Sequence, residues 1–109
     1  MPVATLENKS GNFIKPELQA GQSALASIKL PDNLRAFVTD PPGANAYPIV
    51  TYTWMLLYKK YKSPQVAENL KQVILFGLSQ GQSYSTELGY IPLPDSVISD
   101  DKNALQNVS

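Results

Sequence analysis

The sequence predicts an α/β protein. Its strongest strand signal runs from Ile49 to Tyr58, ten residues without a charge in which β-branched and aromatic side chains dominate the first half. Two prolines indicate helix starts, Pro16 in the first half of the chain and Pro64 in the second. The resulting order is strand, helix, strand, linker, long strand, helix pair and C-terminal tail, and alternation of this kind is typical of α/β proteins.

The first half of the chain contains shorter signals. Residues 3–6 are predicted as a short strand, and residues 9–15 as a loop. A helix is expected from Pro16 to about Ile28. The residues expected on its packed side are Leu18, Ala24, Leu25 and Ile28. Residues 34–38 indicate another short strand, and residues 40–48 (DPPGANAYP) are a linker with turn residues throughout.

The apolar run at residues 49–58 has three interpretations: a membrane anchor, a lipid-seeking helix or a buried strand. A spanning helix needs about 20 apolar residues, and this run has half that length with two threonines inside it. Strand spacing gives one fully apolar face, which consists of Val50, Tyr52, Trp54, Leu56 and Tyr58. The other, largely apolar face consists of Ile49, Thr51, Thr53, Met55 and Leu57. Two apolar faces indicate a central strand covered by helices on both sides.

The helix that follows has clear start signals. Ser63 can cap it, and Pro64 suits the first helical position, where its missing N–H costs nothing. The expected apolar stripe consists of Ala67, Leu70, Val73, Ile74 and Leu78. Gly77 and Gly81 indicate a break, after which residues 82–88 continue as helix to Gly89, a natural C′ residue. The lysines at positions 59, 60 and 62 fall in the connection before this helix, where a solvated loop edge is favoured over an anion or membrane patch.

Composition excludes several function classes. Nine Lys+Arg against nine Asp+Glu give zero net charge, so no basic field attracts nucleic acid. There is no histidine and no cysteine, which removes the usual general base, thiol catalysis and the commonest metal ligands. No nucleophile–base pair or glycine-rich phosphate loop is visible. We therefore predict no enzyme, no cofactor, no metal site and no catalytic residue.

Three polar features remain as weaker candidates. Residues 9–12 (KSGN) can form a nest of backbone N–H groups for an anion, although an ordinary polar turn is favoured. Arg35, the one arginine, can pair an anionic ligand, although a surface role is favoured. Asp100 and Asp101 are an acidic pair expected near a helix start. Asn8 and Asn107 begin glycosylation sequons that are expected by chance.

Three stretches together carry a family resemblance: GNFIKP at 11–16, LPDNLRAFVTDPPGANAYPIVTYTWMLLYKKY at 30–61, and ELGYIPLPDSVI at 87–98. They resemble the C-terminal third of the phosphate-binding protein of the bacterial phosphate-specific ABC transporter, most of all its cyanobacterial members. The resemblance runs from about Pro2 to Ile98, and the last eleven residues are freer. It implies part of a type II periplasmic-binding-protein fold, with mixed or parallel strands flanked by helices.

The same resemblance implies a division of the chain between two lobes. Residues 1–44 would be the end of the second lobe, residues 45–48 the interlobe crossing, and residues 49–109 the completion of the first lobe. Tyr47, Pro48 and Ile49 are the residues expected at the crossing. The neighbours of the central strand would then come from sequence outside this chain.

The family holds phosphate with groups at helix N-termini, an aspartate, and an arginine followed by a Ser-Gly-Thr turn. These motifs lie upstream of the matched part, so we expect no phosphate-binding residue here. The resemblance implies a phosphate-transport component that is unable to bind phosphate alone, with inorganic phosphate and the transporter permease as partners of the full-length fold. The alternative is a standalone module that pairs with itself or with a missing N-terminal lobe. The family is periplasmic, but the N-terminus (MPVATLENKSGNF) has no signal-peptide pattern, so we expect a cytoplasmic location if the chain is expressed alone.

Overall fold

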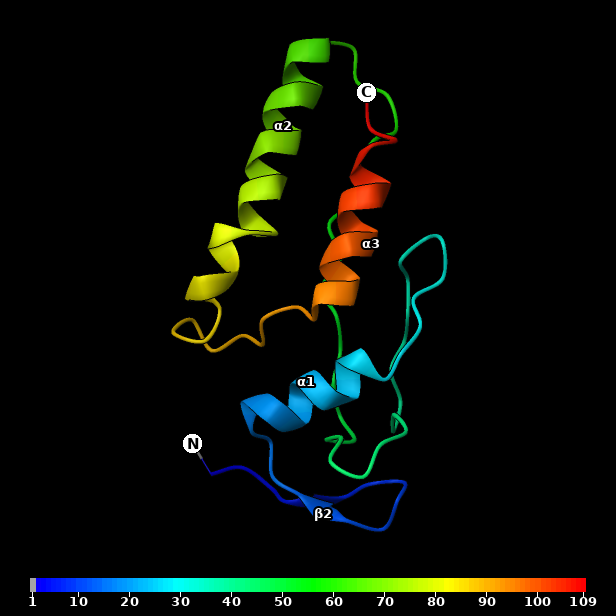
Figure 1. Ribbon diagram of the computed structural model, residues 1–109, viewed down its shortest axis with the longest axis vertical. Coiled ribbons are helices and arrows are strands. Elements are labelled where there is room, and N and C mark those ends of the chain that lie inside the picture. The colour runs from blue at the N-terminus through cyan, green and yellow to red at the C-terminus, as the bar shows by residue number, and fades with distance from the viewer. Residues whose placement is uncertain (1) are drawn as a thin grey trace. The chain divides into compact units, whose positions relative to one another are not determined.

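The computed structural model describes residues 2–109, which form two compact units, one up to Thr53 and the other from Trp54 (Figure 1). The first unit contains β1 (Leu6–Glu7), β2 (Phe13–Ile14) and α1 (Leu18–Ala26). The second contains α2 (Pro64–Gly77), the 3-10 helix η1 (Gln80–Tyr84) and α3 (Asp95–Leu105). Helices and a sheet are thus both present, as predicted, but in residues 2–109 the sheet is a two-stranded antiparallel one and not mixed or parallel. Among residues 2–109, no helix is long and apolar enough to cross a membrane.

The first unit begins with a β-hairpin. Strands β1 and β2 pair antiparallel, with Leu6 opposite Ile14 and Glu7 opposite Phe13. Gly11 turns the chain back with φ +79°, and its N–H donates to the Asn8 carbonyl at 2.9 Å. The predicted strand at residues 3–6 overlaps β1 only at its end. The predicted loop at residues 9–15 is wrong where β2 forms, because the tight turn at Gly11 brings that segment back against β1.

Helix α1 confirms the predicted helix in the first half of the chain. Four of its residues are buried: Ala20, Gly21, Ala24 and Leu25. Leu18 is 40% exposed and Ile28 lies beyond the helix, so the expected packed side was right only for Ala24 and Leu25. The buried Tyr52 donates its hydroxyl to the Leu25 carbonyl at 3.1 Å, which adds a side-chain hydrogen bond to a carbonyl that also accepts from the Ser27 and Ile28 N–H groups.

The strand predicted at residues 34–38 does not form. A turn stands at its start instead, where the Leu34 N–H donates to the Pro31 carbonyl at 2.8 Å and Leu34 adopts φ +58°. The Asn33 side chain accepts a hydrogen bond from the Arg35 N–H at 3.0 Å. Turn chemistry from the Pro-Asp-Asn sequence thus overrides the β propensity of the residues that follow.

The buried strand predicted at residues 49–58 is also wrong for the described part of the chain. Ile49 forms an isolated antiparallel bridge with Thr39, and no named strand follows it. Of the ten residues only Tyr52 is buried, while Leu56 is 91% exposed. A strand requires a ladder of backbone hydrogen bonds with a neighbour, and in residues 2–109 the bridge of Ile49 to Thr39 is isolated and does not extend into a ladder. The segment is therefore left without regular structure.

Helix α2 confirms the helix predicted from Pro64, with Pro64 at its first turn. The Ser63 side chain makes no capping hydrogen bond, so its predicted capping role is wrong; its carbonyl accepts from the Val66 and Ala67 N–H groups at 3.1 and 3.3 Å. The expected stripe is only partly packed. Ala67 is buried, Leu70, Ile74 and Leu78 are half-buried, and Val73 is 67% exposed.

The predicted break after α2 is present. Helix η1 starts beyond Gly77, and a Cβ at Gly81 would lie 3.1 Å from the Phe76 carbonyl oxygen, so glycine permits this close approach. The helix predicted at residues 82–88 is wrong beyond Tyr84, where η1 gives way to turns. These turns end at Gly89 with φ +79°, as expected of a C′ glycine. The lysines at 59, 60 and 62 are exposed, in agreement with a solvated loop edge.

Helix α3 occupies what the sequence indicated as a freer C-terminal tail. It runs antiparallel to α2 (Figure 1), and it buries Val97 and Leu105. Asp95 in its first turn and Lys102 in its last turn both complement the helix dipole. After α3 the Ser109 N–H donates to the Lys59 carbonyl at 2.9 Å, and the Ser109 carbonyl accepts from the Tyr61 N–H at 2.6 Å. These two bonds hold the last residue against the segment before α2.

The acidic pair Asp100–Asp101 lies in the middle of α3, so its predicted place near a helix start is wrong. Partial burial raises the pKa of the Asp101 carboxyl above its ordinary value, and the neighbouring charge of Asp100 raises it further.

The raised pKa gives a pH-dependent stability with a definite sign. Because the folded pKa of Asp101 exceeds the unfolded one, this group favours folding below about pH 4 and loses that contribution as pH rises through its folded pKa. We expect Asp101→Asn to raise the melting temperature at pH 7 and to change it little at pH 3. Asp100→Asn is the control, and we expect it to raise the melting temperature at pH 7 by less. Melting curves by circular dichroism across pH 3–8 measure both; a lower melting temperature of Asp101→Asn at pH 7 would contradict the assignment.

The burial of α1 predicts a contrast between two leucines of one helix. Leu25 is 3% exposed and Leu18 is 40% exposed. We expect Leu25→Ala to lower the free energy of unfolding of the first unit by about 2–3 kcal/mol, and Leu18→Ala to cost less than about 1 kcal/mol. Denaturant titration followed by circular dichroism compares them, and equal losses would show that α1 is not packed through Leu25.

Candidate functional site

The first unit contains a polar cluster centred on Asn8, which is buried at 5% exposure. Its side-chain Nδ2 lies within hydrogen-bond distance of the carbonyls of Gly43 (3.1 Å), Ala44 (2.9 Å) and Ala46 (3.1 Å). Its Oδ1 accepts from the N–H groups of Ser10 (3.0 Å) and Asn12 (3.1 Å). The side chain thus joins the hairpin turn of residues 8–12 to the loop of residues 40–46.

The hydrogen bonds of this cluster show whether the N–H groups of residues 9–12 are free to form the suggested anion nest. The Lys9 N–H donates to Asp40 Oδ1 at 3.0 Å, and the Gly11 N–H donates to the Asn8 carbonyl. The N–H groups of Ser10 and Asn12 donate to Asn8 Oδ1. All four N–H groups are therefore committed within the unit, and the favoured interpretation of an ordinary polar turn is the one the structure supports. The buried, bonded Asn8 amide is also unsuited to glycosylation.

Tyr47, Pro48 and Ile49, predicted at an interlobe crossing, are held to the first unit. The Tyr47 N–H donates to the Ala20 carbonyl at 3.2 Å. The Tyr47 hydroxyl donates to the Ala4 carbonyl, also at 3.2 Å. The Pro48 carbonyl accepts from the Asp40 N–H at 3.2 Å, and Ile49 makes the bridge to Thr39. Their role as a crossing stays a prediction.

The remaining polar candidate, Arg35, is exposed, and its guanidinium lies 5.9 Å from the ring centroid of Phe37. This cation–π arrangement agrees with the favoured surface role. In the described part of the chain, no three Asp or Glu side chains gather as metal ligands. Nor do residues 2–109 hold a buried side-chain nitrogen or oxygen that lacks a hydrogen-bond partner.

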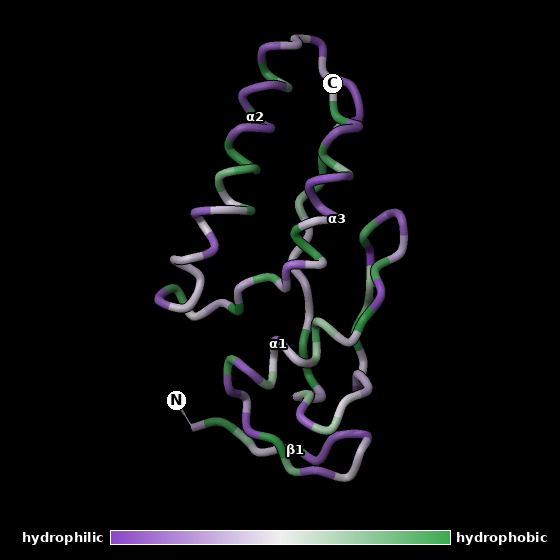
Figure 2. The backbone as a smooth tube through the Cα atoms, in the orientation of Figure 1, coloured by the Kyte–Doolittle hydropathy of each residue, from purple (hydrophilic) through white to green (hydrophobic). Residues whose placement is uncertain are grey.

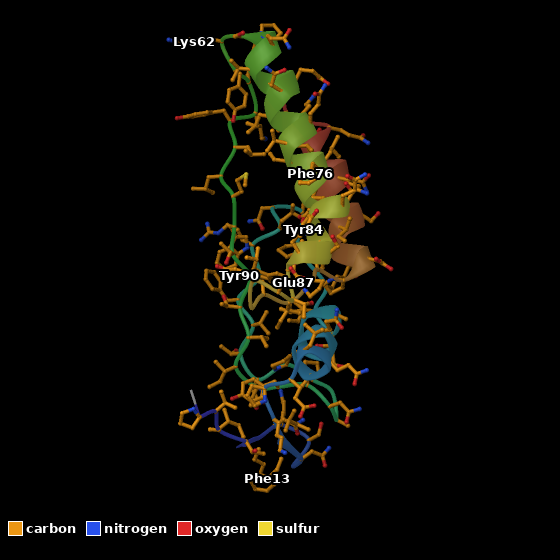
Figure 3. The ribbon with its side chains drawn as sticks, turned by 90° about the vertical axis from the view of Figure 1, so that its left-hand side faces the viewer. Phe13, Lys62, Phe76, Tyr84, Glu87 and Tyr90 are labelled. Carbon is orange, nitrogen blue, oxygen red and sulfur yellow. The ribbon has the colours of Figure 1, made fainter. Side chains whose placement is uncertain are left out.

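The second unit instead presents large apolar side chains to solvent. Figure 2 shows hydrophobic residues along α2 and again in the segment after it. We call the following residues the exposed apolar set: Val66, Val73, Phe76, Tyr84, Leu88 and Tyr90. Phe76 is 52% exposed, and Figure 3 shows Phe76, Tyr84, Glu87 and Tyr90 grouped toward the η1 end of the unit, away from Lys62. Sequence reasoning did not identify this set. Helical spacing had assigned one of its members, Val73, to the packed stripe of α2.

The buried residues are small by comparison. Half of the ten buried hydrophobic residues are alanines, at positions 20, 24, 36, 46 and 67. In residues 2–109 no large side chain is fully buried. Isolated surface hydrophobics are ordinary, whereas several large ones on one unit are a candidate for an interaction surface if they form a contiguous patch.

Comparison with known proteins shows which proteins this chain is similar to. The chain is 33% identical to the phosphate-binding protein PstS of Methanocaldococcus jannaschii, in an alignment of 121 positions that covers 99% of this chain and 31% of the relative. It is 28% identical to the PstS proteins of Pasteurella multocida and Haemophilus influenzae, over 87% and 91% of this chain and 28% and 30% of those proteins.

No protein-family model matches the chain. The chain spans about a third of the length of the curated relatives it matches. The predicted family resemblance is therefore confirmed: nearly the whole chain is similar to a segment of phosphate-binding proteins named PstS. The particular likeness to cyanobacterial members stays a prediction.

Proposed function

We propose that this chain is a segment of the phosphate-binding component of an ABC transporter, and that it supplies structure to that component rather than phosphate ligands. The observation that carries the proposal is the similarity along 99% of the chain to about a third of a protein named for phosphate binding. A binding role, not an enzymatic one, follows from that similarity. The periplasm and the transporter permease are the compartment and partner that this role implies.

The proposal that phosphate is not held by this chain alone rests on its polar groups. Desolvated anion recognition needs free N–H donors or a cation aimed at the ligand. The N–H groups of residues 9–12 are used within the first unit. The Arg35 guanidinium lies over Phe37 at the surface. Neither feature provides a preformed oxyanion site.

The proposed contribution of the second unit is its exposed apolar set, which we assign as packing surface for the remainder of a PstS-like protein. Burying a large apolar side chain stabilises a structure by about 1.5–3 kcal/mol relative to leaving it exposed. The exposed segment at residues 54–58 would gain in the same way from a neighbouring strand. In this arrangement, residues 1–44 belong to the second lobe, residues 45–48 cross, and residues 49–109 complete the first lobe.

The proposal predicts opposite phosphate binding in two contexts. The chain alone should show no saturable heat with inorganic phosphate in isothermal titration calorimetry up to millimolar ligand. A chimera in which the chain replaces the matching segment of the Methanocaldococcus jannaschii relative should bind phosphate stoichiometrically. Submicromolar binding by the chain alone would overturn the assignment of a purely structural role, and a folded chimera without binding would contradict the assigned place in the family.

The packing role of the exposed apolar set predicts a second contrast. Phe76→Lys should leave the helix content of the isolated chain unchanged, because the ring is half-exposed there. In the chimera the same change should abolish cooperative folding or lower the melting temperature by about 10 °C or more, since it places a charge in a packed site.

Gln72→Lys, an exposed position on the same helix, is the matched control and should be neutral in both. Sedimentation velocity on the isolated chain tests the alternative, in which this surface binds a second copy of the chain. A stable dimer that Phe76→Lys dissociates would assign the surface to a second copy instead.

A further inference from the structure

Asn8 is the one buried polar residue in the described part of the chain, and both halves of its amide are in use. A side-chain amide offers two N–H donors and an oxygen with two lone pairs. Here the nitrogen faces three carbonyl oxygens, at 2.9–3.1 Å, and the oxygen faces two N–H groups, at 3.0 and 3.1 Å. The reversed orientation would set oxygen against three carbonyls and nitrogen against two donors, so the network fixes the amide orientation.

The site therefore requires a neutral group that both donates and accepts over a short reach. A carboxylate of the same shape would keep the two accepted bonds but would place its charge against three carbonyl oxygens. An apolar side chain would leave all five backbone groups of the cluster without this partner, at a cost for each that is buried. The requirement is thus for an amide, and not simply for a residue of this size.

What the amide holds is the loop that leads into Tyr47. Gly43, Ala44 and Ala46, whose carbonyls it binds, lie directly before Tyr47 in sequence. Two further bonds join the same turn and loop, from Lys9 N–H to Asp40 Oδ1 and from Asn12 Nδ2 to the Ala44 carbonyl, both at 3.0 Å. Both of these are exposed, so water competes for them, whereas the Asn8 bonds are wholly or partly buried.

We propose that Asn8 is a positioning residue, an amide clasp that fixes the loop of residues 40–46 on the hairpin turn and so sets the path of residues 47–49 out of it. The use of that path as a crossing between lobes rests on the proposed function. The clasp itself does not, and it is tested on the chain alone without phosphate. A failure here and a failure of the phosphate proposal are therefore distinguishable.

The test is Asn8→Asp, read out by hydrogen exchange of the Tyr47 N–H, which is bonded to the Ala20 carbonyl. At pH 7 we expect the protection factor of this amide to fall by about 10- to 100-fold, the equivalent of one buried polar group left unsatisfied. On acidification the introduced carboxyl becomes a donor again, so protection should partly return below about pH 4. A purely steric defect would show no such recovery.

The charged groups near the site are Glu7, Lys9 and Asp40. The native chain carries all three, so its own protection at each pH is the reference. The Leu78 N–H in the second unit, bonded to the Ile74 carbonyl at 2.8 Å, is the internal control and should not change. Asn12→Ala, which removes one exposed bond, should lower Tyr47 protection by no more than about threefold.

Two results would overturn the proposal: unchanged Tyr47 protection in Asn8→Asp at pH 7, or a loss of protection that is the same at pH 7 and pH 3.5. If Asn8→Asp unfolds the first unit at neutral pH, the proposal is tested instead by circular dichroism during acidification of the same sample. Recovery of helix signal supports the clasp, and its absence contradicts it.

Discussion

The burial of apolar surface is the constraint on which the rest of this structure depends. A small domain is stable only when its larger hydrophobic side chains leave water, because their transfer is the main favourable term against conformational entropy. Here five of the ten buried hydrophobic residues in the described part of the chain are alanines, while Leu56, Phe76 and Tyr90 remain exposed. In the first unit, hydrogen bonds between the hairpin turn and the loop of residues 40–46 add to this small core.

Sequence reasoning succeeded where the signal was local. Helix α2 was predictable because Pro64 fits a first helical turn, and the end of the turns that follow η1 because Gly89 takes a positive φ. It failed at residues 49–58, where the two-faced strand pattern is present but the bridge of Ile49 to Thr39 does not extend into a ladder in residues 2–109. It also misplaced the helix near Asp100 and Asp101, which starts at Asp95 and buries Val97 and Leu105.

The polar cluster around Asn8 shows a different limit of prediction from sequence. The turn at residues 8–12 could be predicted from its Asn and Gly residues, and such side chains commonly bond their own backbone two residues on, as Asn8 does to the Ser10 N–H. The partners across 35–38 residues of sequence could not be predicted, since no local pattern marks the carbonyls of Gly43 to Ala46 as acceptors. The family resemblance placed the same loop next to a crossing, but it did not indicate what holds the loop.

The pairing of Ser109 with Lys59 and Tyr61 has a topological consequence. These bonds close a loop of 50 residues, so the second unit ends beside a segment only a few residues after its start at Trp54 (Figure 1). The helices α2 and α3 and the 3-10 helix η1 therefore all lie within one loop whose ends, at Lys59 and Ser109, are hydrogen-bonded to each other. Separating α3 from the segment before α2 would first have to break these bonds.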